Sequence, residues 1–139
     1  MQDQTTPQEE HATVTGCHHT ALCVHDLDEA RRFYGKVLSL VEIERPPEIA
    51  KKFRSAWFLI GSSELHVIEN PKFQRLDSSL APHIAVCTSD FDAFTAQVAQ
   101  RGGKFRFGPA PGPDGILRAV IEDATGNVVE ITTAPLREP

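Results

Sequence analysis

Four side chains in this sequence have the types and the spacing of a metal-ligand set. His19 and His83 are 64 residues apart, and so are His66 and Glu130. Within each half the histidine and its partner are separated by 47 residues. Three imidazoles and one carboxylate suit a divalent transition metal and leave room for water or a substrate. Burying such groups without partners costs roughly 1–3 kcal/mol each, and a metal would supply the partner. We therefore predict a metal site built from these four residues.

A repeated frame in the sequence fixes which histidine is the candidate ligand. Residues 19–26 read His-Thr-Ala-Leu-Cys-Val-His-Asp, and residues 83–90 read His-Ile-Ala-Val-Cys-Thr-Ser-Asp. Because the 64-residue offset extends from the first to the last predicted strand, we interpret the chain as a duplicated unit. The repeat selects His19 over its neighbour His18, since adjacent residues of a strand face opposite sides. We expect His18 to face the helix layer or the solvent.

Hydrophobic periodicity predicts the same order of elements in both halves, which is a strand, a helix and then three strands. Asp26 and Asp90 follow the first strands and suit the cap of a helix N-terminus. In the first half we expect strands at residues 16–24, 41–45, 53–60 and 64–69 and the helix at 27–38. In the second half we expect strands at residues 83–88, 104–107, 116–122 and 128–132, the helix at 91–101 and a Pro/Gly loop at 108–115.

Length and composition fit one globular domain. The chain has 139 residues, of which 40% are hydrophobic and 24% charged. We expect the domain at residues 15–133, with modules at 16–69 and 83–132 and flexible tails at 1–14 and 134–139. No apolar run approaches the roughly 20 residues of a membrane-spanning helix. A net charge of -5 without a Lys/Arg cluster argues against nucleic acid as a partner. Three cysteines and the lack of a signal-peptide pattern indicate a cytoplasmic protein with reduced thiols.

The motifs around these positions resemble the vicinal-oxygen-chelate superfamily. Residues 26–38 read Asp-Leu-Asp-Glu-Ala-Arg-Arg-Phe-Tyr-Gly-Lys-Val-Leu, and residues 63–69, 82–86 and 126–131 fit the other signature places. The superfamily includes glyoxalase I, methylmalonyl-CoA epimerase, extradiol dioxygenases, and fosfomycin- and bleomycin-resistance proteins. The resemblance covers residues 16–132 and implies an α+β fold. In this fold two tandem βαβββ modules form a cupped, mixed β-sheet half-barrel with helices on the outside, and the protein is usually a homodimer.

The resemblance implies a metal ion that holds two neighbouring oxygens of a small substrate. Such an ion stabilises a developing oxyanion and acidifies an adjacent C–H, so a base must lie nearby. The first hypothesis is therefore lyase or isomerase chemistry with Glu130 and His66 as catalytic residues and Zn, Ni, Co, Mn or Fe as the metal. Glyoxalase I has a carboxylate at the place that His66 occupies here, so the resemblance does not extend to that particular reaction.

Two alternatives stay open. A non-haem iron(II) dioxygenase would use His19, His83 and Glu130 as ligands and keep His66 as an acid/base beside them. It would also need a tyrosine near the last strand, whereas the only tyrosine here is Tyr34, in a helix. The other alternative is a non-catalytic binding or resistance protein, although binding proteins of the bleomycin type lack the metal set.

Three residues are candidates for binding the substrate: Arg54, Arg118 and Trp57. Arg54 and Arg118 are 64 residues apart and could clamp a substrate carboxylate or phosphate, or lie solvated on the outer sheet face. Trp57 could line the pocket or pack against the helix layer. Glu64 is interpreted as an exposed carboxylate at a strand end.

Overall fold

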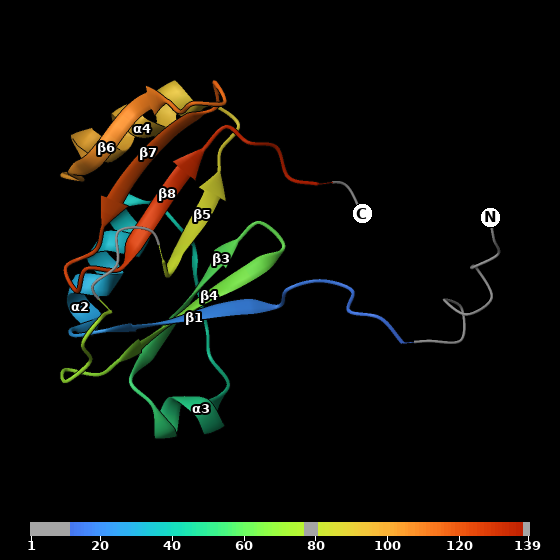
Figure 1. Ribbon diagram of the computed structural model, residues 1–139. Coiled ribbons are helices and arrows are strands. Elements are labelled where there is room, and N and C mark those ends of the chain that lie inside the picture. The colour runs from blue at the N-terminus through green and yellow to red at the C-terminus, as the bar shows by residue number, and fades with distance from the viewer. Residues whose placement is uncertain (1–11, 77–80, 138–139) are drawn as a thin grey trace.

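The computed structural model describes residues 12–76 and 81–137, which form two βαβββ modules in tandem (Figure 1). The first module consists of β1 (His19–Val24), α2 (Leu27–Ala30), η1 (Arg31–Val37), β2 (Glu42–Ile43), α3 (Pro47–Lys52), β3 (Ser55–Ile60) and β4 (Ser63–Glu69). The second consists of β5 (His83–Cys87), α4 (Phe91–Gln100), β6 (Phe105–Pro111), β7 (Leu117–Glu122) and β8 (Val128–Thr132). The predicted α+β fold of two tandem modules is confirmed.

Each module forms its own four-stranded mixed sheet, and neither sheet closes into a barrel. The strand orders are β1-β4-β3-β2 and β5-β8-β7-β6. The first strand of each module pairs in parallel with the last one, and the remaining pairs are antiparallel. β1 and β5 are therefore edge strands of their sheets, and both candidate ligands His19 and His83 are at their first positions.

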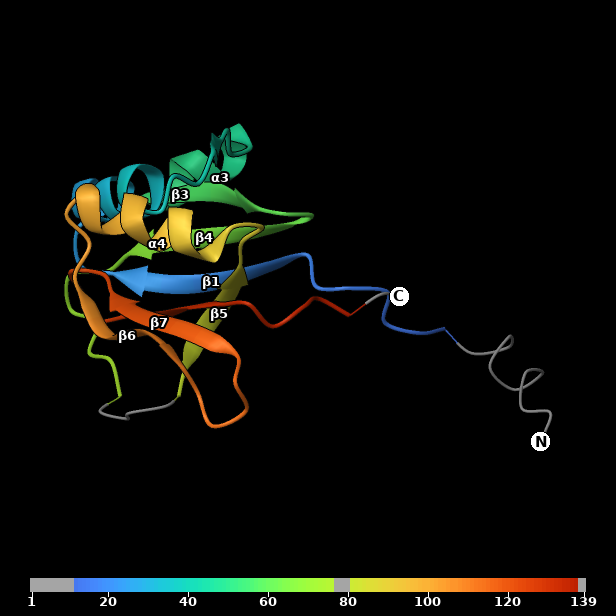
Figure 2. The ribbon, with the colours of Figure 1, turned by 90° about the horizontal axis from the view of Figure 1, so that it is seen from above.

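Both long helices begin where the capping aspartates predict. The side chain of Asp26 accepts a hydrogen bond from Glu29 N at 3.1 Å, and that of Asp90 accepts one from Ala93 N at 3.0 Å. α2 continues without a break into η1, a π-helical stretch in which Leu38 N donates to Phe33 O at 2.9 Å. In the view from above, α4 and the α2–η1 helix both lie on the same side of β1 (Figure 2).

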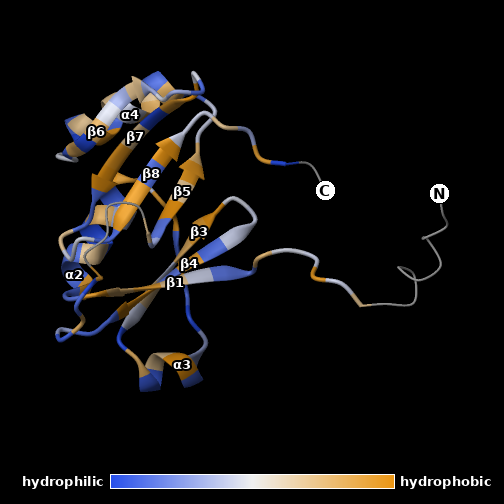
Figure 3. Cartoon of the chain, viewed as in Figure 1, coloured by the Kyte–Doolittle hydropathy of each residue, from blue (hydrophilic) through white to orange (hydrophobic). Residues whose placement is uncertain are grey.

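The helix-facing sides of the two sheets share one hydrophobic core. Alternate strand residues contribute to it, and the hydropathy colouring shows the resulting apolar strands in both sheets (Figure 3). Fully buried side chains come from both modules: Val24, Tyr34, Phe58, Leu65 and Val67 from the first, and Val98, Ile121, Val129 and Ile131 from the second. The opposite face of each sheet, which we call the open face, carries the candidate ligands.

A buried polar network also joins the modules. Tyr34 OH donates to Asp123 Oδ2 at 2.8 Å, and Asn127 Nδ2 donates both to Asp123 Oδ2 and to Cys23 O. Burial and the Asp123 charge raise the pKa of Tyr34. Because these partners lie 89 and 104 residues apart in the chain, the network fixes one module against the other.

Two differences from the predicted elements concern the connections between strands. The helix α3 was not predicted, although Pro47 in its first turn, Glu48 after it and Lys51 and Lys52 at its end are typical helix signals. β6 extends to Pro111, into the residues predicted as a loop, with register shifts against β7. Most of the predicted tail 1–14 and part of the segment between the two predicted modules lie outside the described residues. Among the described residues, no helix is long and apolar enough to cross a membrane.

Candidate metal centre

The first module brings His19 and His66 into ring contact on its open face. β1 and β4 pair in parallel, with Ala21 opposite His66, so the two histidines point to the same side of the sheet. Their ring centroids are 4.1 Å apart and the rings are nearly parallel, at 13°. His19 is exposed, whereas His66 keeps only 7% of its surface accessible. The pair therefore presents one accessible and one buried imidazole to the same space.

Glu64 is part of this group, which the sequence did not predict. Its Oε1 atom lies 2.9 Å from Nε2 of His66. The hydrogen bond from His66 holds the pKa of Glu64 below its ordinary value. An ionised carboxylate only accepts hydrogen bonds, so Nε2–H of His66 is the donor. The same strand parity of residues 64 and 66 was the available signal for this contact.

Trp57 covers the other side of His66. The two residues are paired across β3 and β4, and their rings stack with centroids 3.8 Å apart and planes at 2°. His66 is therefore enclosed between the rings of His19 and Trp57, which locks its orientation. Of the two positions left open for Trp57, the structure shows the one beside His66 at the cavity.

The second module brings Glu130 to His83 on the equivalent face. Oε1 of Glu130 lies 3.4 Å from Nε2 of His83. Nε of Arg118 donates to the other carboxylate oxygen at 3.1 Å, and both carboxylate oxygens of Asp114 accept from the Arg118 guanidinium at 2.9 and 3.0 Å. These bonds lower the pKa of Asp114 to about 2 and raise the pKa of Arg118. Arg118 thus orients Glu130 while leaving its Oε1 atom toward His83.

His18 does not behave as expected from strand alternation. Its Nδ1 atom lies 2.9 Å from Nδ1 of His19, and both rings line the same cavity. β1 begins only at His19, so the residue before it is not bound by the two-sided alternation of a regular strand. His18 is exposed to solvent, which is one of the two positions expected for it, but it does not lie on the side opposite His19.

Arg54 and Arg118 lie on opposite sides of their sheets despite their 64-residue spacing. His66 pairs with Trp57, whereas Glu130 pairs with Val120, which follows Trp57 by 63 residues. Arg54 consequently lies on the same side of its sheet as the core residues, where it forms an ion pair with Glu69. Arg118 lies on the open face of the other sheet, beside Glu130. Only Arg118 of these two arginines lies beside a candidate ligand.

The described residues hold the four predicted ligands as two separate pairs. No group of three His, Cys, Asp or Glu residues in residues 12–76 and 81–137 has the arrangement of a metal site. The chemistry of each pair nevertheless fits an ion. Two donors bound to one tetrahedral metal at about 2.0–2.1 Å are about 3.4 Å apart, which is the spacing of His83 Nε2 and Glu130 Oε1. The His83–Glu130 pair thus has the donor spacing of two ligands on one ion, and the His19–His66 pair supplies two imidazoles of the kind that a divalent metal binds.

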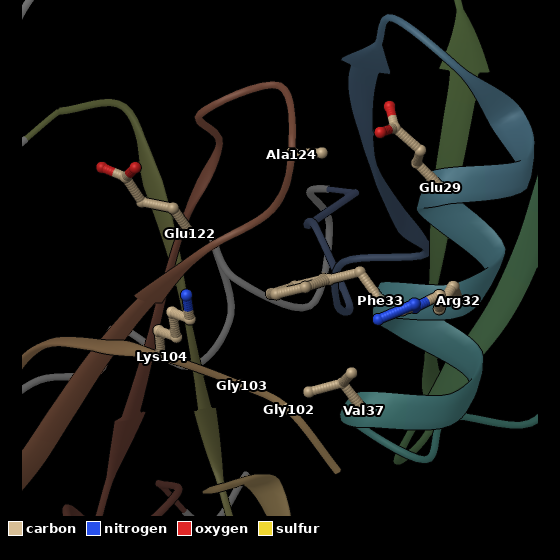
Figure 4. A pocket seen from close by; sticks show the side chains of 9 residues that line it. All are labelled: Glu29, Arg32, Phe33, Val37, Gly102, Gly103, Lys104, Glu122 and Ala124. Atoms are coloured by element: carbon tan, nitrogen blue, oxygen red, sulfur yellow. The ribbon is translucent and has the colours of Figure 1, made fainter.

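Two of the cavities differ in the residues that line them. One, of about 350 Å³, lies on the open face of the first sheet and is lined by His18, His19, Ile49, Phe53, Ser55, Trp57, His66 and Ile68. The other, of about 390 Å³, lies between η1 and the turn from α4 to β6 (Figure 4). Its side chains mix both charges, from Glu29 and Arg32 on one wall to Lys104 and Glu122 on the other, and it contains none of the predicted ligands.

Comparison with known proteins identifies the superfamily of this chain. The model of the Glyoxalase/Bleomycin resistance protein/Dioxygenase superfamily matches residues 16–131, so the chain belongs to this superfamily. The resemblance found from the motifs is thereby confirmed. Among curated proteins, no sequence matches.

Solved structures show the same fold. A protein of the glyoxalase family from Bacillus anthracis is 27% identical with a TM-score of 0.73, over 88% of this chain and 97% of that chain. The fosfomycin resistance protein FosX from Listeria monocytogenes is 18% identical with a TM-score of 0.70, over 89% of this chain and 94% of that one. FosX from Mesorhizobium loti is 23% identical with a TM-score of 0.65, over 89% and 95% of the two chains.

Proposed function

We propose that this protein is a divalent-metal-dependent enzyme of glyoxalase-like type, with lyase or isomerase chemistry on a small substrate chelated through vicinal oxygens. His19, His66, His83 and Glu130 would hold the ion. One observation carries the proposal: both modules present a donor pair at the same place on the open face, beside the first position of an edge strand. A duplicated donor pair is hard to explain by core packing, because both pairs lie outside the shared core.

We further propose that a second copy of the chain completes the site, so that the enzyme is a homodimer. The modules are joined through their helix faces, so the pairs of one chain do not form a single cluster among the described residues. His19 and Ala21 on β1 and His83 and Ala85 on β5 are exposed, although edge strands usually need protection. A twofold axis would bring the first module of one chain to the second module of its partner and form two identical sites.

The bound ion would stabilise negative charge that develops on the substrate oxygens and would acidify the neighbouring C–H. The protein's own residues supply the rest of the chemistry. Glu64 is an ionised acceptor within hydrogen-bond distance of His66, so the two can receive and hold a proton near the ligand pair. Trp57 excludes water from the buried side of His66. Arg118 fixes the orientation of Glu130 through Nε.

The iron dioxygenase alternative is disfavoured by the position of Tyr34. Its side chain is fully buried in the core and its hydroxyl donates to Asp123, so the chain's only tyrosine is not available on the open face. A dioxygenase site on the open face would therefore lack the tyrosine that the resemblance to extradiol dioxygenases implies.

Metal identity and the effect of His66→Ala separate these two functions. We expect zinc, nickel, cobalt or manganese by elemental analysis, and loss of metal from His66→Ala while His25→Ala, outside the site, retains it. Iron that stays bound in His66→Ala, together with oxygen uptake on catechols, would support the dioxygenase instead. Absence of metal after reconstitution with each ion would contradict both functions.

A further inference from the structure

The 350 Å³ cavity beside the histidine pair has a wall that only one of the two modules possesses. α3 and Phe53 form this wall, between β2 and β3. Between β6 and β7, where the structure describes every residue, the second module has only a turn at residues 112–116. The open faces of the two modules therefore differ: one carries an added apolar wall, and the other carries the Asp114–Arg118 ion pair.

Apolar and aromatic side chains dominate this cavity. Ile49 and Phe53 come from the α3 wall, and Trp57 and Ile68 come from the open face of β3 and β4. Half of the Phe53 surface is exposed, so this part of the ring is accessible to a ligand in the cavity. A cavity of this size suits a ring-sized group of a small ligand.

The wall is held in place before any ligand arrives. Nη1 of Arg45 donates to Phe53 O at 2.7 Å and to Ser55 Oγ at 2.9 Å. These bonds tie the segment before α3 to the residues that follow α3, and they occupy the hydroxyl of the buried Ser55. The cavity therefore keeps its shape and presents few unsatisfied polar groups, both of which favour an apolar ligand.

The candidate ligands are themselves part of the cavity lining. His19 and His66 form one side of it, and the Trp57 ring that stacks on His66 forms another. Any substrate bound at these histidines through its oxygens must therefore place its neighbouring atoms against Phe53 and Trp57. This continuity favours part of the substrate over a protein segment as the occupant.

We infer that the substrate carries a flat apolar group, of about the size of a phenyl ring, next to the vicinal oxygens, and that this group lies in the Ile49–Phe53–Trp57 cavity. The inference rests on the proposed metal function, because the metal would hold the oxygens. Aliphatic substrates with the same oxygens would bind more weakly because they leave the cavity unfilled.

Two hydroxamates give a matched test, since both offer the same pair of oxygens to a metal. Acetohydroxamate carries a methyl group and benzohydroxamate a phenyl ring. With zinc-loaded protein, we expect benzohydroxamate to bind about 10- to 100-fold more tightly, because more apolar surface is buried. Trp57 is the only tryptophan, so its fluorescence reports binding directly, and calorimetry gives the affinity.

Variants of the wall separate this inference from the metal function. The double variant Ile49→Ser/Phe53→Ser should reduce the preference for benzohydroxamate to near unity while acetohydroxamate binds as in the wild type. Val41→Ser, an exposed apolar residue outside the cavity, should keep the wild-type preference. Circular dichroism would verify that the variants fold. Equal binding of both compounds by wild-type protein would overturn the assignment of the cavity to the substrate and leave the metal function intact. A cavity filled by a second chain would give this result. Binding of neither compound would overturn the metal function and, with it, this inference.

Discussion

His66 lies flat between two other rings, with the Trp57 indole 3.8 Å away on one face and the His19 imidazole 4.1 Å away on the other. A histidine held in this way has no freedom to rotate, and its remaining polar contact is with Glu64. Such fixed orientation is what a metal ligand or a proton-transfer residue requires. The contact also connects the candidate site to the only tryptophan of the chain.

Cobalt(II) should quench the fluorescence of Trp57 when it binds. The paramagnetic ion would be held by the histidine that stacks on the indole, whereas zinc should produce only a small change. His66→Ala should lose the saturable quenching, and His25→Ala should keep it. A titration followed by steady-state emission measures this. Unchanged emission in the wild type at saturating cobalt would contradict a metal at His66.

Arg118→Gln should weaken metal binding by about 10- to 100-fold, because Glu130 would lose the Arg118 Nε contact that orients its carboxylate. Competition with a chromogenic chelator measures the affinity. Arg54→Gln is the matched control, since Arg54 also pairs with a glutamate but on the other side of its sheet. Equal losses in the two variants would mean that the effect is one of overall charge and not of ligand orientation.

Tyr34 should resist ionisation in the folded protein. Its pKa is raised above the ordinary value of 10.0 by burial and by the Asp123 charge. A group whose pKa is higher in the folded state contributes stability below its unfolded pKa and loses it as the pH rises further. Tyrosinate absorbance should therefore appear only when the protein unfolds at alkaline pH. Circular dichroism monitors this unfolding. Absorbance that rises near pH 10 in a folded protein would contradict the buried hydrogen bond.

Removal of the same hydroxyl should also weaken the link between the modules. Tyr34→Phe leaves Oδ2 of Asp123 with only the Asn127 amide, and we expect a loss of about 1.5–3 kcal/mol in the free energy of unfolding. Urea unfolding at neutral pH measures it. Phe33→Leu, at the neighbouring half-buried position, controls for the change in helix packing.

Much of the fold could be predicted because the repeat and the strand periodicity agree. The capping aspartates and the frames starting at His19 and His83 located the first strand and helix of each module. The 64-residue offset also indicated that His66 and Glu130 belong to the last strand of their modules. In each case a local pattern was enough, because the partners lie in regular strands of known parity.

The positions of Arg54 and α3 could not be predicted because the two modules differ in the lengths of their connections, and the sequence repeat does not show these differences. The β3–β4 turn has two residues, Gly61 and Ser62, whereas Asp123 N bonds to Asn127 O around a three-residue turn. One additional residue reverses the facing of the preceding strand, which is why Arg54 and Arg118 lie on opposite sides. Likewise, α3 has no equivalent in the second module's β6–β7 connection, so the repeat gave no indication of it.

The central claim is that the His19–His66 pair of one chain and the His83–Glu130 pair of another form one metal centre. Mixing two variants tests it directly. His19→Ala/His66→Ala lacks the first pair and His83→Ala/Glu130→Ala lacks the second, so neither should bind metal alone. After equal amounts are unfolded together and refolded, half of the dimers would be mixed and each would contain one intact site. Elemental analysis should then find about one ion per chain in the wild type and about one per four chains in the mixture. A wild-type protein without metal, or a mixture without metal, would contradict the account.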